Sequence, residues 1–542
     1  MDWRRALPDF DAKWIAHDDG KILVVDKPPF ISSQAADPSH PDDLVTRMTA
    51  SLGGYVGVHQ RLDKETSGLI LFVRDPKENA RIAAEFENRR VTKKYLACVE
   101  RWPNKPKITL TDALAEGKDG RTEVVRKGRG KAAVTHVRVI ERAGPRALLE
   151  LELETGRTHQ ARVQLAHAGA PIAGDALYLG PKAPRLLLHS SALKIGALSV
   201  ESSAPSEFRE WLAKGDLGEA AYDDPDAVAR RIGWAAQKRW GLARSTETTA
   251  FRLVHDEADA LPGMAVDVFG GHFVLQLFEQ AGLWTDARIG RVIDALSVLE
   301  PDGIYLKIRR RSRVEGRAED SPREPVRGVA AASPLVVLEE GLEFLVRLEG
   351  GPAVGLYLDQ RRNRTRVKHA SAGKRVLNLF SYTCAFTVAA IAGGARETVS
   401  VDSSASALER GRENVLRTGA DMKQHAFSCG DAAAFLVRAA RKNDRFDIVI
   451  LDPPSFGRAG SRSFSIDRDF GVLAGASLAV LAPKGVLLAC TNHRQTSQAA
   501  LRKILHDAAR AAKRTVGQMK DMSLGADFPG DPTMKSVWLR LD

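Results

Sequence analysis

The stretch VHQRLDKETSGLILFVRD at residues 58–75 joins a polar segment to an apolar run. Its second half, GLILFVRD, has the branched and aromatic residues of a buried strand. Arg61 and Asp63 stand two residues apart directly before that strand. In extended backbone both side chains point to one face, so we expect the guanidinium to keep the Asp63 carboxylate ionised. The pattern predicts a charged pair at the mouth of a buried strand, with Asp63 as a candidate nucleophile.

The sequence on both sides of this stretch, up to residue 205, alternates short β-rich runs with loops, and helical patterns are less frequent. Examples are KILVVDK at 21–27, KKYLACVE at 93–100 and RALLELELE at 146–154. Such alternation is typical of a sheet with antiparallel neighbours. We therefore expect an α+β domain built on an antiparallel or mixed sheet over residues 1–205.

A second polar segment, TGRTHQARVQLAHAG at 155–169, is rich in side chains that donate hydrogen bonds to phosphates and base edges. Taken alone, it is either a nucleic-acid contact or a solvated basic strand followed by an ordinary helix. Its donors are Arg157, Thr158, His159, Gln160 and Arg162.

Together with DKPPF at 26–30, KKYLACV at 93–99 and RLLLHSSAL at 185–193, these two segments resemble the pseudouridine synthases of the large-subunit-uridine family. The resemblance covers nearly all of the first 200 residues. It departs from the family at Gln60, because histidine usually stands directly before the arginine, and at Phe30, where glycine is common.

The resemblance implies that this domain converts uridine to pseudouridine without a cofactor. Asp63 would be the nucleophile or base. Arg61 would help to hold the target nucleotide out of its helix, and Tyr95 would pack against the extruded uracil. Arg162 would pair with Asp63.

The composition changes after residue 205. Residues 206–245 are rich in Ala, Asp and Glu, and predict a linker. Residues 246–345 return to strand patterns and predict a β-rich middle domain, which we expect to bind RNA. The charged stretch RRRSRVEGRAED at 309–320 interrupts this domain and indicates an exposed loop.

From residue 346 to 542, strand and helix patterns alternate as in a doubly wound α/β sheet. VLNLFSYTCAFTVAAIAGG at 376–394 indicates a strand, a tight loop and a helix, and TVSVD at 398–402 a second strand. Asp402 follows the loop by roughly twenty residues, the spacing at which such folds place an acid against ribose hydroxyls. The loop lacks GxGxxG, so S-adenosylmethionine fits better than a dinucleotide. Asp431, after the next expected strand, is a candidate for the adenine amino group.

FDIVILDPPSFG at 446–457 is an apolar strand that ends in Asp452 and two prolines, which fix a rigid lip where ligands bind in such sheets. With GLYLDQRRNR at 355–364 and ALPGMAVDVFGGHFVLQL at 260–277, it resembles the class I methyltransferases of large-subunit ribosomal RNA, both the 5-methylcytosine enzymes and their guanine-modifying relatives. The resemblance covers roughly residues 230–542. It implies a catalytic role for Asp452 and cofactor contacts from Tyr357, Gln360, Asn378, Phe380, Ser381, Tyr382, Thr383, Asp402, Asp431, Asp452 and Pro453.

The methylated atom stays open between two alternatives. Cytosine C5 becomes nucleophilic only after a thiolate adds to C6, and Cys490 in GVLLACTNHR at 485–494 is the candidate thiolate. The following TNHR resembles guanine-modifying members, which need no thiolate. We place cytosine slightly behind a ring or exocyclic nitrogen of guanine. His493 and Arg494 either contact RNA or form a plain polar loop.

Composition agrees with an RNA partner, which we expect to be 23S rRNA or a large-subunit precursor. The 80 Lys and Arg residues exceed the 68 Asp and Glu residues, a net charge of +12 that favours a polyanion. Four scattered cysteines and the absence of a signal or membrane segment indicate a reducing cytoplasm, and no metal site is expected. We thus expect a fused enzyme for pseudouridylation and base methylation. The rivals are an RNA-binding assembly factor with inactive sites and a methyltransferase on a non-RNA substrate.

Overall fold

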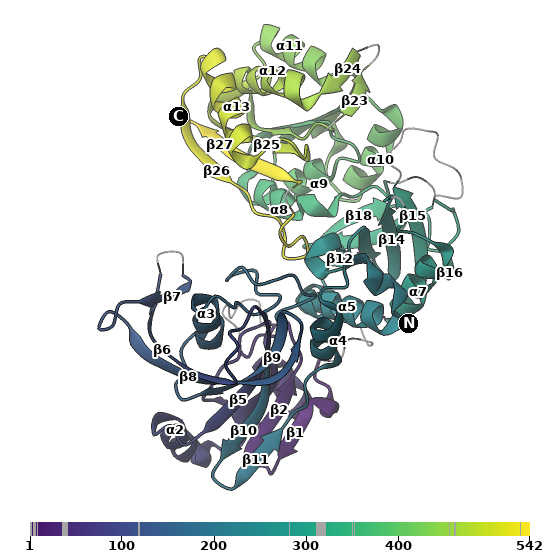
Figure 1. Cartoon of the computed structure of the whole chain (residues 1–542). Coiled ribbons are helices and arrows are strands. Elements are labelled where there is room, and N and C mark those ends of the chain that lie inside the picture. Colours follow the sequence, from purple (N-terminus) through teal and green to yellow (C-terminus); the bar gives the residue numbers. More distant parts are fainter. Residues whose placement is uncertain are drawn as a thin grey trace.

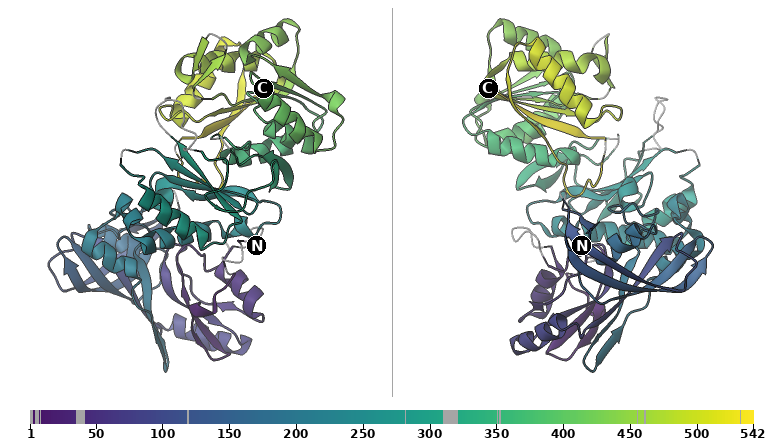
Figure 2. Two further views of the ribbon diagram at one scale, coloured as in Figure 1. Left: turned by 90° about the vertical axis from the view of Figure 1, so that its right-hand side faces the viewer. Right: turned by 60° about the vertical axis from the view of Figure 1, so that its left-hand side comes forward.

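The computed structural model shows a multidomain α/β protein whose parts follow one another in chain order (Figure 1, Figure 2). None of the helices in the described part of the chain combines the length and apolar character of a membrane span. The charged stretch at 309–320 lies almost entirely outside the described residues. The structure describes the backbone alone at 456–459, 462–465 and 467, and does not describe residues 1–2, 4–6, 8, 35–41, 118–119, 281, 310–320, 350, 352, 455, 460–461 and 532.

The first part of the chain forms a mixed sheet in the order β1-β2-β4-β10-β5-β9-β8-β6-β7, with β11 beside β10 and β3 beside β4. Only the β4 and β10 pair is parallel; all other neighbours run antiparallel. Its strands are β1 (Ile15–Asp18), β2 (Ile22–Lys27), β3 (Gly57–Val58), β4 (Ser67–Val73), β5 (Thr92–Glu100), β6 (Lys107–Glu116), β7 (Thr122–Val125), β8 (Lys131–Ala143), β9 (Arg146–Leu153), β10 (Leu188–Ile195) and β11 (Leu198–Glu201). Its helices are α1 (Leu44–Leu52), α2 (Asn79–Glu87) and α3 (Gln160–His167).

Residues 206–245, expected as a linker, are helical and belong to two hydrophobic cores. Helix α4 (Ser206–Lys214) buries Phe208 and Trp211 against the first sheet. Helices α5 (Pro225–Lys238) and α6 (Trp240–Arg244) bury their apolar faces against the middle sheet. The apolar residues of α5 recur at helical spacing among alanines, which explains how a segment with few branched residues still packs on a sheet.

The middle of the chain contains a sheet in the order β12-β13-β14-β15-β16, in which β14 and β15 are parallel and joined by α7 (Asp286–Ser297). Helices α5 and α7 cover one face. A hairpin and elements of the last part cover the other. The strands are β12 (Ala250–His255), β13 (Met264–Phe269), β14 (His272–Phe278), β15 (Gly303–Arg309) and β16 (Arg327–Gly328), and the hairpin is β17 (Leu335–Glu339) with β18 (Leu342–Val346).

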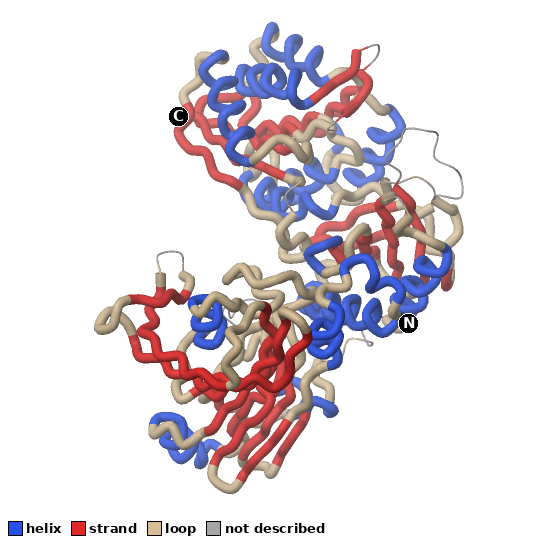
Figure 3. The backbone as a smooth tube through the Cα atoms, viewed as in Figure 1, coloured by secondary structure: helices blue, strands red, loops and turns tan. Residues whose placement is uncertain are grey.

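The last part contains a sheet in the order β21-β20-β19-β22-β25-β27-β26, with helices on both faces (Figure 3). All neighbours are parallel except β27, which runs antiparallel to β25 and β26. The strands are β19 (Arg375–Leu379), β20 (Glu397–Asp402), β21 (His425–Cys429), β22 (Phe446–Leu451), β25 (Leu481–Thr491), β26 (Val516–Asp521) and β27 (Lys535–Leu541). A hairpin, β23 (Phe456–Ala459) with β24 (Arg462–Ser465), follows β22.

The two faces of this sheet hold separate cores, because successive strand residues point to opposite sides. Leu487 and Ala489 of β25 face the core under α11, α12 and α13. Leu488 and Cys490 face the core under α8 and α9. The helices are α8 (Arg361–Ala370), α9 (Ala385–Ala392), α10 (Ala405–Leu416), α11 (Ala432–Arg441), α12 (Ile466–Ala479) and α13 (Gln498–Ala511).

Two candidate active sites

A cavity of about 860 Å³ lies in the first part of the chain, beside the loop before β4 that contains Asp63. The loop at 58–64, strand β5 and the segment 153–159 line it. Asp63, Arg61, Tyr95 and His159 all face this space, so both polar segments of the sequence meet here.

Asp63 belongs to a chain of charges that runs into the protein. Nη1 of Arg162 donates to Asp63 Oδ2 at 3.1 Å, as predicted. The same guanidinium donates from Nε and Nη2 to the two carboxylate oxygens of Asp175 at 2.7 and 2.8 Å. Asp175 is fully buried, whereas 27% of the Asp63 side chain is exposed. Asp175 thus fixes the arginine, and the arginine presents a charged partner to Asp63, which lines the cavity.

The expected ion pair between Arg61 and Asp63 is wrong. Residues 60–63 form a loop, not a strand, so the period of two does not hold there. Arg61 is exposed at the cavity wall, and the guanidinium beside Asp63 is that of Arg162. His159 Nε2 is 3.8 Å from Asp63, and burial lowers the pKa of this histidine.

Tyr95 points from β5 into the cavity and is largely buried. Burial first, and the nearby Asp63 charge second, raise the pKa of Tyr95 to about 12. The phenol is therefore neutral near pH 7. It offers a ring and a hydroxyl rather than a base.

Sequence reasoning gave no role to Lys27, although it quoted DKPPF. Its side chain is fully buried, and Nζ donates to the carbonyls of Pro28, Ile31 and Lys64 at 3.1, 2.9 and 3.3 Å. Burial lowers the pKa of Lys27 to about 7. Lys27 ties the DKPPF loop to the loop that presents Asp63. The motif itself was the only available signal, because no pattern marks a lysine as buried.

The loop after β19 is the centre of the second site. Phe380, Tyr382 and Cys384 have φ of 56°, 47° and 60°, so alternate residues are left-handed and the turn is tight. Tyr382 N donates to Asp402 Oδ2 at 2.8 Å, and Ser404 N donates to Oδ1 at 2.8 Å. Asp402 therefore stands beside the loop, at the carboxyl end of β20.

Several predicted cofactor residues form hydrogen bonds within the protein, in or near this edge of the sheet. Asn378 is buried and donates to Thr387 Oγ1 at 3.0 Å. Thr383 Oγ1 donates to the carbonyl of Gly355 at 2.5 Å. Ser381 is buried within the turn, and its N–H donates to Val401 O. Asp431 Oδ1 accepts from Ala434 N at 2.8 Å and caps α11.

Asp452 and Pro453 follow β22 at the next position along the sheet edge. Gln360 Nε2 donates to Asp452 Oδ2 at 2.8 Å. Burial first, and then the charge of Asp359, raise the pKa of Asp452 to about 7. Asn363 continues this network, because its amide donates to Gln360 Oε1 at 2.6 Å.

Cys490 lies beneath this network instead of facing a cavity. Its side chain has no exposed surface, and Asn363 Nδ2 is 3.7 Å from Sγ. Burial raises the pKa of the Cys490 thiol well above its usual value. Two and four residues later, Asn492 and Arg494 are exposed and line a cavity of about 750 Å³ between the middle sheet and the last part of the chain.

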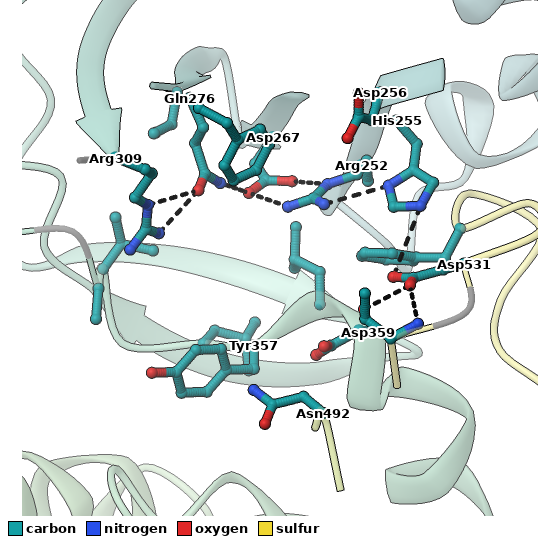
Figure 4. A pocket seen from close by; sticks show the side chains of 18 of the residues that line it. Arg252, His255, Asp256, Asp267, Gln276, Arg309, Tyr357, Asp359, Asn492 and Asp531 are labelled. Atoms are coloured by element: carbon teal, nitrogen blue, oxygen red, sulfur yellow. Dashed lines mark hydrogen bonds and ion pairs between the residues drawn. The ribbon is translucent and has the colours of Figure 1, made fainter. Parts of the chain in front are cut away.

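This second cavity has an aromatic side and a polar wall (Figure 4). Tyr357 is 54% exposed there, and its ring centroid is 5.4 Å from that of Tyr382. The middle sheet supplies the wall, which sequence reasoning missed because its residues come one at a time from different strands. These residues are Arg252, Asp267, Gln276 and Arg309.

The comparisons with known proteins match the two parts of the chain that contain these sites to two different families. Residues 21–167 match the family model for RNA pseudouridylate synthase, and residues 271–532 match that for S-adenosylmethionine-dependent methyltransferase. Ribosomal RNA large subunit methyltransferase I of Klebsiella pneumoniae (strain 342) is 33% identical over 336 residues, which are 59% of this chain and 82% of that protein.

The chain belongs to the S-adenosylmethionine-dependent methyltransferases. The corresponding enzyme of Aeromonas salmonicida (strain A449) is 33% identical over 309 residues, 56% of this chain and 76% of that protein. The solved structure of SMU.776 complexed with SAH has a TM-score of 0.53 and 26% identity, and covers 66% of this chain and 88% of that chain. The last part of the chain is thus a methyltransferase domain that uses S-adenosylmethionine, and the first part is a pseudouridine synthase domain. The protein is an enzyme.

The residues present fit S-adenosylmethionine. The tight turn at 380–384 and the partly exposed Asp402 carboxylate lie side by side at the carboxyl end of the sheet, where nucleosides bind in doubly wound folds. Tyr357 and Tyr382 add adjacent rings. Both prolines after Asp452 hold a rigid lip at the same edge.

Proposed function

We propose that this protein is a bifunctional RNA-modification enzyme. One site isomerises uridine to pseudouridine, and the other methylates a guanine nitrogen. The segments that we assign are 1–205 for the synthase, 206–245 for a connector, 246–345 for the RNA-binding middle domain and 346–542 for the methyltransferase. The grouping of strands supports this division, since the large sheets use residues 15–201, 250–328 and 375–541.

Asp63 carries the proposed isomerisation. The reaction breaks the bond between N1 of uracil and C1′ of ribose, forms a bond between C5 and C1′, and moves a proton from C5 to N1. A carboxylate can act in these steps as nucleophile or base, and Arg162 supports the ionised form of Asp63. Tyr95 provides a ring against which the base packs, and Arg61 contacts the flipped nucleotide.

The positions of two residues favour guanine over cytosine as the methylated base. Asn492 lines the cavity, whereas Cys490 is buried behind it. Attack at C6 of cytosine needs a thiolate that reaches the base. A thiol with no exposed surface and a raised pKa is poorly suited to that step. A guanine nitrogen already has a lone pair or acquires one by losing a proton, so it needs orientation and a proton acceptor.

The proposed cofactor contacts are those of the turn and the strand ends. Asp402 would hold the ribose hydroxyls, and Asp431 the adenine amino group. Tyr382 and Phe380 would contact the adjoining parts of the cofactor. Tyr357, Gln360, Asn378, Ser381, Thr383 and Pro453 would shape the site, and Asp452 would face the reacting end. When bound, S-adenosylmethionine supplies an electrophilic methyl group.

We propose ribosomal RNA of the large subunit as the substrate. Relatives named ribosomal RNA large subunit methyltransferase I support this proposal, and the net charge of +12 agrees with a polyanionic partner. The exposed Arg494 and Arg61 place positive charge at the two cavities.

The test uses purified protein and ribosomal RNA from a strain that lacks the gene. The RNA is incubated with and without S-adenosylmethionine and then digested to nucleosides for mass spectrometry. We expect new pseudouridine under both conditions and a new methylguanosine only with the cofactor. If 5-methylcytidine appears instead, the guanine assignment is wrong. If neither modification appears, a binding factor or a non-RNA substrate explains the protein better.

A further inference from the structure

The cavity between the middle sheet and the methyltransferase domain has a polar wall whose charges satisfy one another. Arg252 donates from Nε and Nη2 to the two carboxylate oxygens of Asp267 at 2.7 and 3.0 Å. Gln276 also donates to Asp267. Arg309 donates from Nε and Nη2 to Gln276 Oε1 at 3.1 and 2.8 Å. Because these groups hold each other, the wall is rigid before any ligand enters (Figure 4).

Asp359 faces the same cavity and differs from this wall (Figure 4). Its Oδ1 is buried and accepts no hydrogen bond, and among the described residues it is the one buried carboxylate oxygen of which this holds. A buried oxygen without a donor costs free energy, on the order of 1–3 kcal/mol. In native structures such a group calls for an explanation, for example a catalytic role, local strain or a bound water or ion.

The position of Asp359 links it to the methyl-transfer site. The next residue, Gln360, holds Asp452 at 2.8 Å, and the exposed ring of Tyr357 stands two residues before Asp359. Burial raises the pKa of Asp359 to about 6, so the group is mainly an ionised acceptor near pH 7. A ligand in this cavity therefore meets an aromatic surface and the partly exposed carboxylate of Asp359, whose buried Oδ1 lacks a donor.

Guanine complements this pair of features better than the other RNA bases do. Its Watson–Crick edge carries two adjacent donors, N1–H and the N2 amino group, which match the oxygens of one carboxylate. Cytosine has one amino donor beside the acceptor N3, and so does adenine with N1; uracil has a single N–H between two carbonyls. The flat base would stack on Tyr357.

We propose that this cavity receives the target base and that Asp359 is the group that selects guanine, by accepting hydrogen bonds from N1–H and the N2 amino group. The inference rests on the proposed methylation of guanine. It adds the residue that reads the base and the edge that is read. A site built to pair with a polar group discriminates strongly against an analogue that lacks it.

The test compares guanosine with inosine, which lacks only the N2 amino group. The probe is an RNA fragment that spans the nucleotide whose methyl group is lost on deletion of the gene, made with either base at that position. The dissociation constants of both fragments are measured for the wild type, for Asp359→Asn and for Glu257→Gln, and kcat/KM for methyl transfer is compared as well where the mapped methyl group is not on N2, which inosine lacks. Glu257 is an exposed acid at the rim of the same cavity, so its variant controls for the loss of one charge.

We expect the wild type and Glu257→Gln to prefer guanosine by about 10-fold or more, and Asp359→Asn to lose this preference to within about twofold. Thermal unfolding of the same sample, compared with the wild type, reports whether the methyltransferase domain is folded. If methylation by Asp359→Asn is too slow to measure, the binding constants of the two RNA fragments give the same ratio.

Two results would overturn the inference while methylguanosine is still formed. One is an unchanged preference for guanosine in Asp359→Asn. The other is a large loss of SAH affinity in this variant, which would assign Asp359 to the cofactor. If the wild type methylates cytosine, the proposed function itself is wrong, and the selection of guanine by Asp359 is wrong with it.

Discussion

Cys490 Sγ lies 3.7 Å from Nδ2 of Asn363, on the face of the sheet that α8 covers. The thiol therefore belongs to the core, and the chain turns to present Asn492 to the cavity only after β25 ends at Thr491. In this protein the only cysteine of the GVLLACTNHR block packs as a small apolar side chain, and Asn492 and Arg494 after it line the cavity.

Replacing Cys490 by alanine should leave methyl transfer within about threefold of the wild type, because the proposed methylation of guanine uses no covalent adduct, and should cost at most about 1 kcal/mol of stability. Asn492→Ala, at the cavity, should reduce kcat/KM by about 10-fold or more. Transfer of a radioactive methyl group from S-adenosylmethionine to RNA measures both. A Cys490→Ala enzyme without activity, yet with unchanged SAH affinity, would support thiolate catalysis.

Replacing Asp63 by asparagine should reduce pseudouridine formation at least about 1,000-fold, since it removes the proposed nucleophile or base while keeping the shape. Glu65→Gln, a nearby exposed acid 4.0 Å from Arg162, is the matched control and should remain active. Pseudouridine is counted by mass spectrometry of treated RNA. Substantial pseudouridine from Asp63→Asn would remove this residue from the mechanism.

Replacing Asp175 by asparagine should impair the same reaction indirectly. It removes the buried partner of Arg162 and leaves Asp63 and the more distant Glu65, which we expect to cost about 3 kcal/mol in the free energy of unfolding and to loosen the arginine beside Asp63. The measurements are urea unfolding and kcat for pseudouridine formation, at a temperature where the variant is folded. Stability and kcat equal to those of the wild type would show that the pair does not position Arg162.

The raised pKa of Asp452 predicts a pH dependence of stability. The folded state binds a proton up to about pH 7, whereas an unfolded aspartate releases it near 3.8, so this group stabilises the fold at low pH and the contribution is lost as the pH rises through 7. Between pH 5 and 8, Tm of Asp452→Asn should therefore fall less than that of the wild type. Glu409→Gln, an exposed acid on α10, should behave like the wild type. Parallel curves for Asp452→Asn would contradict this prediction.

Replacing Asp402 by alanine should weaken SAH binding about 10- to 100-fold. The change removes the proposed ribose contact and also the acceptor that holds Tyr382 N and Ser404 N. Isothermal titration calorimetry with SAH measures this effect, and thermal unfolding of the variant controls for folding of the methyltransferase domain. An unchanged Kd would move the ribose site elsewhere.

The sequence predicted the strands that apolar runs of neighbouring residues form, and one ion pair that the family resemblance implied. The apolar runs of β4, β19 and β22 are strands, and Arg162 pairs with Asp63 as the resemblance implied. The pairing of Arg61 failed because a loop has no fixed period. The burial of Cys490 depends on which face of the sheet α8 covers, and residues near the strand do not encode this.

The polar wall of the second cavity could not be predicted from the sequence, for a related reason. Arg252, Asp267, Gln276 and Arg309 become neighbours only when β12, β13, β14 and β15 pair in register. Asp359 was passed over within GLYLDQRRNR, because the sequence does not show that its oxygen lacks a donor. Both features arise from tertiary packing.

The central claim, two independent active sites on one chain, is tested most directly by mapping the modifications of ribosomal RNA by mass spectrometry. The RNA comes from a strain that lacks the gene and expresses the wild type, Asp63→Ala or Asp402→Ala. We predict reciprocal losses: Asp63→Ala restores only the methylguanosine, and Asp402→Ala restores only the pseudouridine. If both variants restore both modifications, or if the deletion changes neither, the account is wrong.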